Sequence, residues 1–273
     1  MRGILKGNRV KIQTRIRANI GATRCGLNTR AASTKLPRMN ARIPLLALAC
    51  ALLAPKSHGE AVKDREGAVR KDRAALEYDA RWIYNDFHAG FEKARQTGKP
   101  LLVVIRCVPC LACAGIDAQV LEEKALVPLL DQFVCVRVIN ANALDLTLFQ
   151  FDYDLSFSAL FFNGDGTTYG RYGSWTHQRD PLDKTTAGFR RALDAVLAIH
   201  RGYPANKASL AGKQGGAPPD DLRTPVEIPG LAGRYKAELD WEGKVVQSCV
   251  HCHQVGDAFR TAYRDRGLAI PSN

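Results

Sequence analysis

Five of the eight cysteines fall into two short clusters whose spacing could support chemistry. The first cluster places Cys107, Cys110 and Cys113 three residues apart, in two overlapping C-x-x-C units. The second cluster, from Cys249 to His253, has the pattern C-x-x-C-H. Thiols at these spacings can exchange disulfides, bind a metal ion or carry a covalent cofactor.

The second cluster matches the pattern that attaches a c-type haem covalently. Two thiols one helical turn apart can reach the two vinyl groups of a porphyrin, and the histidine that follows can ligate the iron. We therefore expect Cys249 and Cys252 to bind haem c and His253 to be the metal ligand. Two alternatives are a zinc site in which His251 or His253 joins the two thiols, and a plain disulfide between the cysteines.

The second axial ligand of such a haem is left open by the sequence. Met1 and Met39 are the only methionines, and both are lost if an N-terminal leader is removed. The remaining candidates are His88, His177 and His200, or no protein ligand at all.

The first cluster directly follows Leu101–Ile105, a continuous aliphatic run that is typical of a strand buried on both faces. A helix that begins in this cluster would stabilise a thiolate through its free N–H groups and its dipole. A spacing of three residues places two thiols on one helical face, close enough to form a disulfide. Thiol–disulfide exchange requires this arrangement.

The elements around the first cluster predict an α/β fold, a sandwich with a mixed central sheet. A helix and a strand precede the cluster. A second helix and strand follow it, and then an antiparallel pair and a closing helix. The predicted elements are a helix between an Asn85 cap and Gly98, strands at 101–105 and 133–139, a helix at 119–130 broken at Pro128, a hairpin of 159–162 and 167–172, and a helix at 182–197.

From Trp82 to Gly202 the chain resembles the thioredoxin superfamily, specifically exported thioredoxin-like proteins in which a helix, Gly-Lys-Pro and a buried strand precede the redox motif. The resemblance implies a thiol–disulfide oxidoreductase. Counted from Lys99 without a gap, the family's C-x-x-C falls on Cys110 and Cys113. Cys110 is then the nucleophile and Cys113 the resolving cysteine.

An alternative register pairs Cys107 with Cys110, because Pro109 precedes the second cysteine as in the family's usual motif. The chain also departs from the family, which has a cis-proline facing the cysteines where Phe157 or Ser158 stands here. This departure leaves three alternatives to an enzyme. They are a zinc, copper or iron–sulfur site on the cysteine triplet, a structural disulfide, and a non-catalytic module that binds a partner protein.

The formal net charge of +12 is concentrated near the N-terminus. Twelve lysines and arginines precede Ala61, against the single acid Glu60, and the rest of the chain is nearly neutral. We therefore expect no nucleic-acid partner for the body of the protein. The longest apolar run, 43–54, is interrupted by Pro44 and is shorter than the roughly 20 residues of a transmembrane helix, so no transmembrane segment is expected.

Residues 39–61 have the basic, apolar and small-polar order of a secretory signal peptide. We expect translation to start at Met39, with 1–38 a doubtful basic leader, and cleavage near Ala61. An organelle transit peptide or a basic nucleic-acid arm is the alternative. Export predicts a periplasmic or extracellular location, with membrane association only if Cys50 is lipidated.

Export also decides the redox environment of the cysteines. Removal of the leader takes away Cys25 and Cys50 and leaves six cysteines that are free to form disulfides or to bind a cofactor. Of these six, Cys135 lies in the middle of a predicted strand, and we expect it to be a buried small hydrophobe.

The chain thus divides into a charged, alanine-rich tether or loose helix at 62–80, a thioredoxin-like domain at 81–202, a Gly/Pro-rich linker at 203–229 and a small helical haem-c segment at 230–273. Because the last segment is short for a cytochrome c domain, either its haem shelters against the thioredoxin-like domain or the chain is part of a longer protein. The function expected from the sequence is that of an exported redox protein that exchanges thiols and disulfides, or transfers electrons through haem, with a redox partner protein.

Overall fold

The computed structural model describes residues 64–108, 123–153, 157–174 and 186–270. The expected signal peptide at 39–61 lies outside the described residues, as do Cys110, Cys113 and His177. Within the part of the chain that is described, no helix is both long and apolar enough to cross a bilayer.

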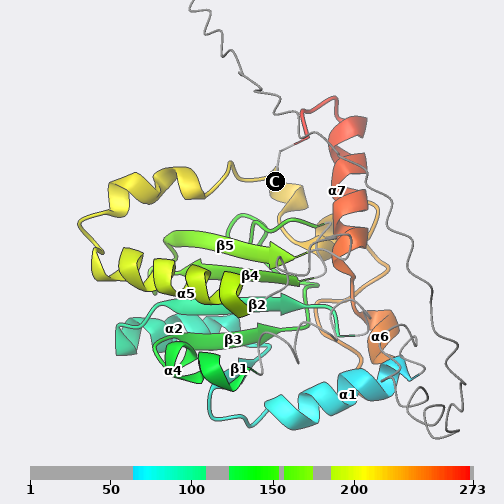
Figure 1. The fold of residues 1–273 in the computed structure, drawn as a ribbon. Helices are drawn as coiled ribbons and strands as arrows, with labels where there is room; N and C mark the ends of the chain where they lie inside the picture. The colour runs from blue at the N-terminus through cyan, green and yellow to red at the C-terminus, as the bar shows by residue number, and fades with distance from the viewer. Residues whose placement is uncertain (1–63, 109–122, 154–156, 175–185, 271–273) are drawn as a thin grey trace, which may run out of the picture. The chain divides into compact units, whose positions relative to one another are not determined.

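A five-stranded mixed sheet forms the centre of the described chain (Figure 1). Its order is β1-β3-β2-β4-β5. The first three strands in that order are parallel, β4 is antiparallel to β2, and β5 is antiparallel to β4. The strands are β1 (Trp82–Tyr84), β2 (Leu101–Arg106), β3 (Val134–Val138), β4 (Phe157–Phe162) and β5 (Thr168–Ser174). This topology confirms the predicted α/β sandwich.

Side chains alternate between two hydrophobic layers because successive residues of a strand point to opposite faces. Leu101, Val103 and Ile105 of β2 join the layer under α2 (Phe87–Thr97), whereas Leu102 and Val104 join the layer under α5 (Thr186–Arg201). All six residues of β2 are buried, as a continuous aliphatic run predicts. The sheet therefore lies between two helical layers, and residues 82–201 are called the sheet domain below.

Helix α2 begins one residue later than predicted. Asp86, not Asn85, is its N-cap, and the Asp86 carboxylate accepts a hydrogen bond of 2.8 Å from the Ala89 N–H. Asn85 has a positive φ of 57°, and its side-chain oxygen accepts the N–H groups of Ile139 and Asn140. Gly98 ends the helix in the left-handed conformation, as expected.

The remaining elements of the sheet domain agree with the sequence except at two places. The strands at 101–105 and 133–139 and the hairpin are confirmed, and α5 covers the described part of the predicted closing helix. The three-residue strand β1 is not among the predicted elements. Of the helix predicted at 119–130, residues 119–122 lie outside the described residues. In the rest, Glu123 is extended and a 3₁₀ turn, η3 (Lys124–Leu126), leads into α4 (Val127–Leu130). Pro128 does not break α4, because it lies in the first turn, where no N–H is needed.

The charged tether and the linker are both packed in the structure. The tether contains α1 (Arg65–Leu76), which buries Val69. The linker forms three 3₁₀ helices, η5 (Lys207–Lys213), η6 (Asp220–Leu222) and η7 (Pro225–Glu227). Leu210, Leu222 and Ile228 are buried. Burial of these apolar residues holds the linker against the rest of the described chain.

Residues 230–270, called the C-terminal segment below, contain two helices, α6 (Val245–Ser248) and α7 (Cys252–Asp265). Buried residues of α7 belong to the same hydrophobic cluster as α2 and one face of the sheet. Tyr153 and Phe259 lie with their ring centroids 5.7 Å apart in this cluster. The C-terminal segment is therefore part of one continuous core, on the side toward which the β2 arrowhead points in Figure 1.

Candidate functional site

The carboxyl end of β2 brings Cys107, the first cysteine of the first cluster, to the C-terminal segment. Cys107 directly follows the last residue of β2, and its Sγ lies 3.0 Å from Nδ1 of His251. His251 belongs to the C-x-x-C-H motif, 144 residues further along the chain. The structure therefore places Cys107 of the first cluster beside the C-x-x-C-H motif.

Cys249, in the C-terminal segment, faces the same cavity as Cys107. Cys107 and Cys249 both line a small cavity of about 10 Å³. The other lining residues are apolar: Val69, Val108, Ile139, Leu239, Val245 and Val246. Burial, and to a lesser extent the nearby Cys107, raises the pKa of the Cys249 thiol to about 12. This thiol is within hydrogen-bond distance of the Ile139 carbonyl oxygen, at 3.4 Å.

Asn142, in the loop after β3, fixes the backbone of the motif. Its side chain is fully buried, and its Oδ1 accepts a hydrogen bond of 2.8 Å from the Val250 N–H. Its Nδ2 donates to the carbonyl oxygens of Ser248 and Lys236, at 2.8 and 2.7 Å. Because one side chain bonds three separate backbone groups of the C-terminal segment, it sets the position of Cys249.

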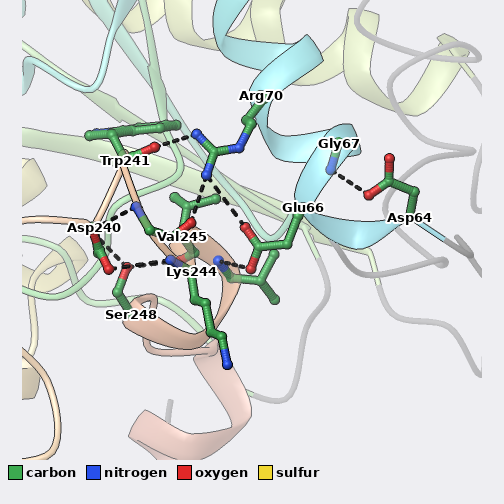
Figure 2. Close-up of polar contacts among 11 residues, drawn as sticks. Asp64, Glu66, Gly67, Arg70, Asp240, Trp241, Lys244, Val245 and Ser248 are labelled. Atoms are coloured by element: carbon green, nitrogen blue, oxygen red, sulfur yellow. Dashed lines mark hydrogen bonds and ion pairs between the residues drawn. The ribbon is translucent and has the colours of Figure 1, made fainter.

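Helix α1 closes the site on one side, and Figure 2 shows the contacts that it makes. The Arg70 guanidinium donates to the carbonyl oxygens of Trp241 and Gly243. The Glu66 carboxylate accepts the Val246 N–H at 3.0 Å. The Arg73 guanidinium lies 4.4 Å from the centre of the Trp241 ring, in a cation–π contact. The segment predicted to be a loose helix or tether therefore docks on α6 and on the turn before it.

Cys252 and His253 lie on the other side of the motif. Cys252 is the first residue of α7 and packs, partly buried, against the main core. His253 is exposed. Within the part of the chain that is described, no three His, Cys, Asp or Glu side chains gather closely enough to hold a metal ion. The four described cysteines are all in the thiol form.

A covalent haem fits these residues only in part. The exposed His253 could face a group at the surface. Cys249, in contrast, faces a cavity of about 10 Å³, which is roughly the space of one water molecule. A porphyrin bonded to both thiols therefore does not fit this arrangement of α1, α6 and α7.

The described histidines considered as second axial ligands contact other parts of the chain. His200 uses both ring nitrogens, with the Tyr169 hydroxyl at 2.9 Å and the Gly98 carbonyl oxygen at 2.7 Å. His88 is exposed at the start of α2, with its ring 4.2 Å from that of Phe87. His177 lies outside the described residues.

The remaining site residues predicted from the sequence divide into two groups. Cys110 and Cys113 lie outside the described residues, so neither C-x-x-C register is tested. Phe157 and Ser158 begin β4 and pair with Arg106 and Ile105, beside the end of β2 that carries Cys107.

Cys135 takes the place that the sequence predicts for it. It is fully buried in β3. Burial raises the pKa of its thiol to about 12, so this thiol stays protonated at neutral pH.

Comparison with known proteins agrees with this architecture. Residues 82–164 match a family model described as thioredoxin-like. The fold of the sheet domain is thioredoxin-like. The match ends in the turn between β4 and β5, so the C-terminal segment lies beyond it. No curated protein matches the chain.

The sequence alone does not predict the contact between Cys107 and His251, nor the roles of Asn142 and Arg70. His251 enters the sequence patterns only as an alternative zinc ligand. Asn142 and Arg70 lie in no recognisable motif, because their partners are backbone groups that carry no signature in the sequence. The buried amide beside the cysteines is visible only once the loop after β3 has been placed.

Proposed function

We propose that this is an exported thiol–disulfide redox protein whose reactive thiols lie at the carboxyl end of β2. The contact of 3.0 Å between the Cys107 thiol and the His251 imidazole carries the proposal. An imidazole at hydrogen-bond distance can accept the thiol proton and leave a thiolate, which is the form that attacks disulfides. The thioredoxin-like fold supports the same class of chemistry.

Cys110 and Cys113 complete the proposed redox centre, because they follow Cys107 at three-residue intervals. A redox partner protein with a dithiol would supply electrons, and a disulfide-bonded substrate would accept them. The proposal gives the protein the activity of a thiol–disulfide oxidoreductase.

Reduction of insulin disulfides by glutathione, followed by turbidity, tests the activity. We expect the wild-type chain to accelerate the reaction and the Cys110→Ser variant to be clearly slower than wild type. Cys113→Ser then identifies the register, since it should slow the reaction as Cys110→Ser does only if Cys113 is the partner of Cys110. Cys135→Ala is the matched control, because Cys135 is buried away from the site. A wild-type chain without activity would favour the partner-binding alternative.

Export is a separate part of the proposal, supported by the order of residues 39–61. Cell fractionation with N-terminal sequencing tests it. We expect a mature chain that begins near Ala61, in the periplasm or the medium. A full-length chain in the cytosol with all thiols reduced would contradict export.

The C-x-x-C-H motif and the exposed His253 favour a second candidate, a protein that carries haem c on Cys249 and Cys252 with His253 on the iron. When bound, haem c would supply one-electron transfer. This candidate requires Cys249 to leave its cavity. Expression in a strain that attaches haem c should then give a Soret band that survives acid–acetone extraction and is lost in Cys252→Ala. Elemental analysis of the same protein distinguishes iron from zinc or copper.

A further inference from the structure

Two thiols from distant parts of the chain share one apolar cavity. Cys107 follows the strand that leads into the first cysteine cluster, and Cys249 opens the C-x-x-C-H motif. Both line the cavity, and after burial the charge of Cys107 is the second cause that raises the pKa of the Cys249 thiol. None of the three C-x-x-C units accounts for this pairing, because each unit joins cysteines that are neighbours in sequence.

The two thiols are held in place by the rest of the site. His251 contacts the Cys107 sulfur at 3.0 Å, which ties the motif to the end of β2. Asn142 holds the backbone on either side of Cys249 through Ser248 and Val250. Helix α1 covers the cavity through Val69. The arrangement leaves both cysteines in the wall of the same small cavity.

We propose that Cys107 and Cys249 are a redox pair that forms a disulfide between the sheet domain and the C-terminal segment. This inference rests on the proposed thiol–disulfide function and adds a second resolving cysteine to it. The substrate class is a disulfide that reaches the partly exposed Cys107.

The exchange takes place in two steps. The Cys107 sulfur attacks one sulfur of the substrate disulfide while its proton passes to His251, so that a mixed disulfide forms and the first substrate sulfur leaves as a thiolate. The Cys249 sulfur then attacks the Cys107 sulfur, the mixed disulfide breaks, and the second substrate sulfur leaves. The two leaving thiolates take up the protons from His251 and from Cys249. The two protein thiols are oxidised to one disulfide, the substrate disulfide is reduced to two thiols, and a dithiol partner restores the pair.

The position of the pair gives this disulfide a structural consequence. In the oxidised state a covalent bond would join the end of β2 to the turn between α6 and α7, in addition to the contacts of Asn142 and α1. In the reduced state only the noncovalent contacts remain. The redox state of the pair would therefore set how firmly the C-terminal segment is attached to the sheet domain.

Peptide mapping of the full chain tests the pairing. The Cys110→Ser variant is used so that Cys107 cannot pair with Cys110. It is oxidised with glutathione disulfide, its free thiols are blocked, and it is digested without reductant. We expect a peptide that links Cys107 to Cys249. The linked peptide should persist in Cys110→Ser/Cys252→Ser and in the control Cys110→Ser/Cys135→Ala.

A second measurement follows the intermediate. In Cys110→Ser/Cys113→Ser/Cys249→Ser, neither the first cluster nor Cys249 can resolve the Cys107–glutathione adduct, which should become the major form, whereas it should be minor in Cys110→Ser/Cys113→Ser. Cys249→Ala in place of Cys249→Ser gives the same readout if the serine variant does not fold. The proposal is overturned if Cys249 is found linked to Cys252 or to a porphyrin, or if the adduct is equally abundant in both variants. Insulin reduction by the wild-type chain, measured in parallel, reports separately on the proposed function.

Discussion

The cysteines of this chain differ because their surroundings differ. Cys135 lies in β3 among apolar side chains of the layer under α5, and its thiol is fully buried. Cys107 lies at the end of β2 beside an imidazole and is partly exposed. A thiol surrounded by hydrocarbon stays protonated and does not start an exchange, whereas a thiol beside a base can lose its proton. We therefore assign the proposed redox role to Cys107 and a packing role to Cys135.

The buried thiol of Cys135 should make stability depend on pH in the alkaline range. Burial raises the pKa of this thiol from the ordinary 9.0 to about 12. Above pH 9 the unfolded chain loses this proton while the folded chain keeps it, so the free energy of unfolding falls as pH rises from 9 toward 12. Well below pH 9 the thiol is protonated in both states and contributes no pH dependence.

Comparison with Cys135→Ala isolates this contribution, because alanine cannot ionise. Between about pH 8 and about pH 10, wild type should lose about 1.4 kcal/mol more free energy of unfolding than the variant does. Urea unfolding of both chains at the two pH values measures the difference. Equal losses in the two chains would show that the Cys135 thiol ionises as readily in the folded state as in the unfolded state.

Asn142 acts as a positioning residue, and its removal should loosen the motif. Asn142→Ala leaves a buried N–H and two carbonyl oxygens without their partner. Each buried unsatisfied group costs about 1–3 kcal/mol, so the variant should be destabilised by at least that much. Alkylation of Cys249 in the folded protein should also become faster. Asn140→Ala is the control: it removes a hydrogen bond to the Ala237 carbonyl oxygen and one from the Asn142 N–H, but none to the motif, so it should cost less and leave Cys249 protected.

At the level of elements, α1 is attached to the sheet by a buried ion pair. The side chains of Asp72 in α1 and Arg137 in β3 are 9% and 6% exposed, and the Tyr84 hydroxyl donates to the same carboxylate at 2.9 Å. Removing one member of a buried pair leaves the other charge without compensation. The ion pair therefore controls whether α1 stays in place beside the cavity.

Asp72→Ala should lower the free energy of unfolding by about 3–5 kcal/mol, because Arg137 would remain buried and charged. The double variant Asp72→Leu/Arg137→Met should recover most of that loss, since it buries no charge. Asp131→Ala is the matched control: it breaks an exposed pair with Arg81 and should cost at most about 1 kcal/mol. Urea unfolding measures all three. A loss in Asp72→Ala no larger than that of the control would show that the pair is not buried in solution.

Local and distant interactions explain which elements could be predicted from the sequence. The strand β2 and the end of α2 at Gly98 follow from patterns within a few residues, an aliphatic run and a glycine stop. Helix α1 itself has a local cap in Asp64, but its docking depends on partners such as the Trp241 carbonyl, 171 residues away from Arg70. A single sequence carries no periodic signal for such pairs. The charged composition of 62–80 therefore predicts a loose helix or tether, whereas in the structure α1 is a helix docked on α6 and the turn before it.

At the level of the whole described chain, the structure joins two parts that the sequence pattern separates. The Gly/Pro-rich composition of 203–229 predicts a linker between two modules. The structure instead packs Val250, Val255 and Phe259 of the C-terminal segment into the same cluster as buried side chains of β2. Gly256 permits this close approach, because a Cβ there would lie 2.7 Å from Cβ of Tyr153. Composition alone cannot show such a shared core, because burial of a segment depends on the faces that it meets.

A shared core predicts that the described chain unfolds as one cooperative unit. Trp82 in β1 and Trp241 beside α6 report on the sheet domain and on the C-terminal segment. Two variants test the prediction, one that keeps Trp82 alone and one that keeps Trp241 alone, with the other tryptophans, Trp175 included, changed to phenylalanine. Fluorescence of each should give the same urea midpoint as that variant's own far-ultraviolet circular dichroism, because neither part keeps its core once the other unfolds. A Trp241 transition at clearly lower urea than the circular dichroism transition of the same variant would show instead that the C-terminal segment detaches on its own, as a linker between independent modules would allow.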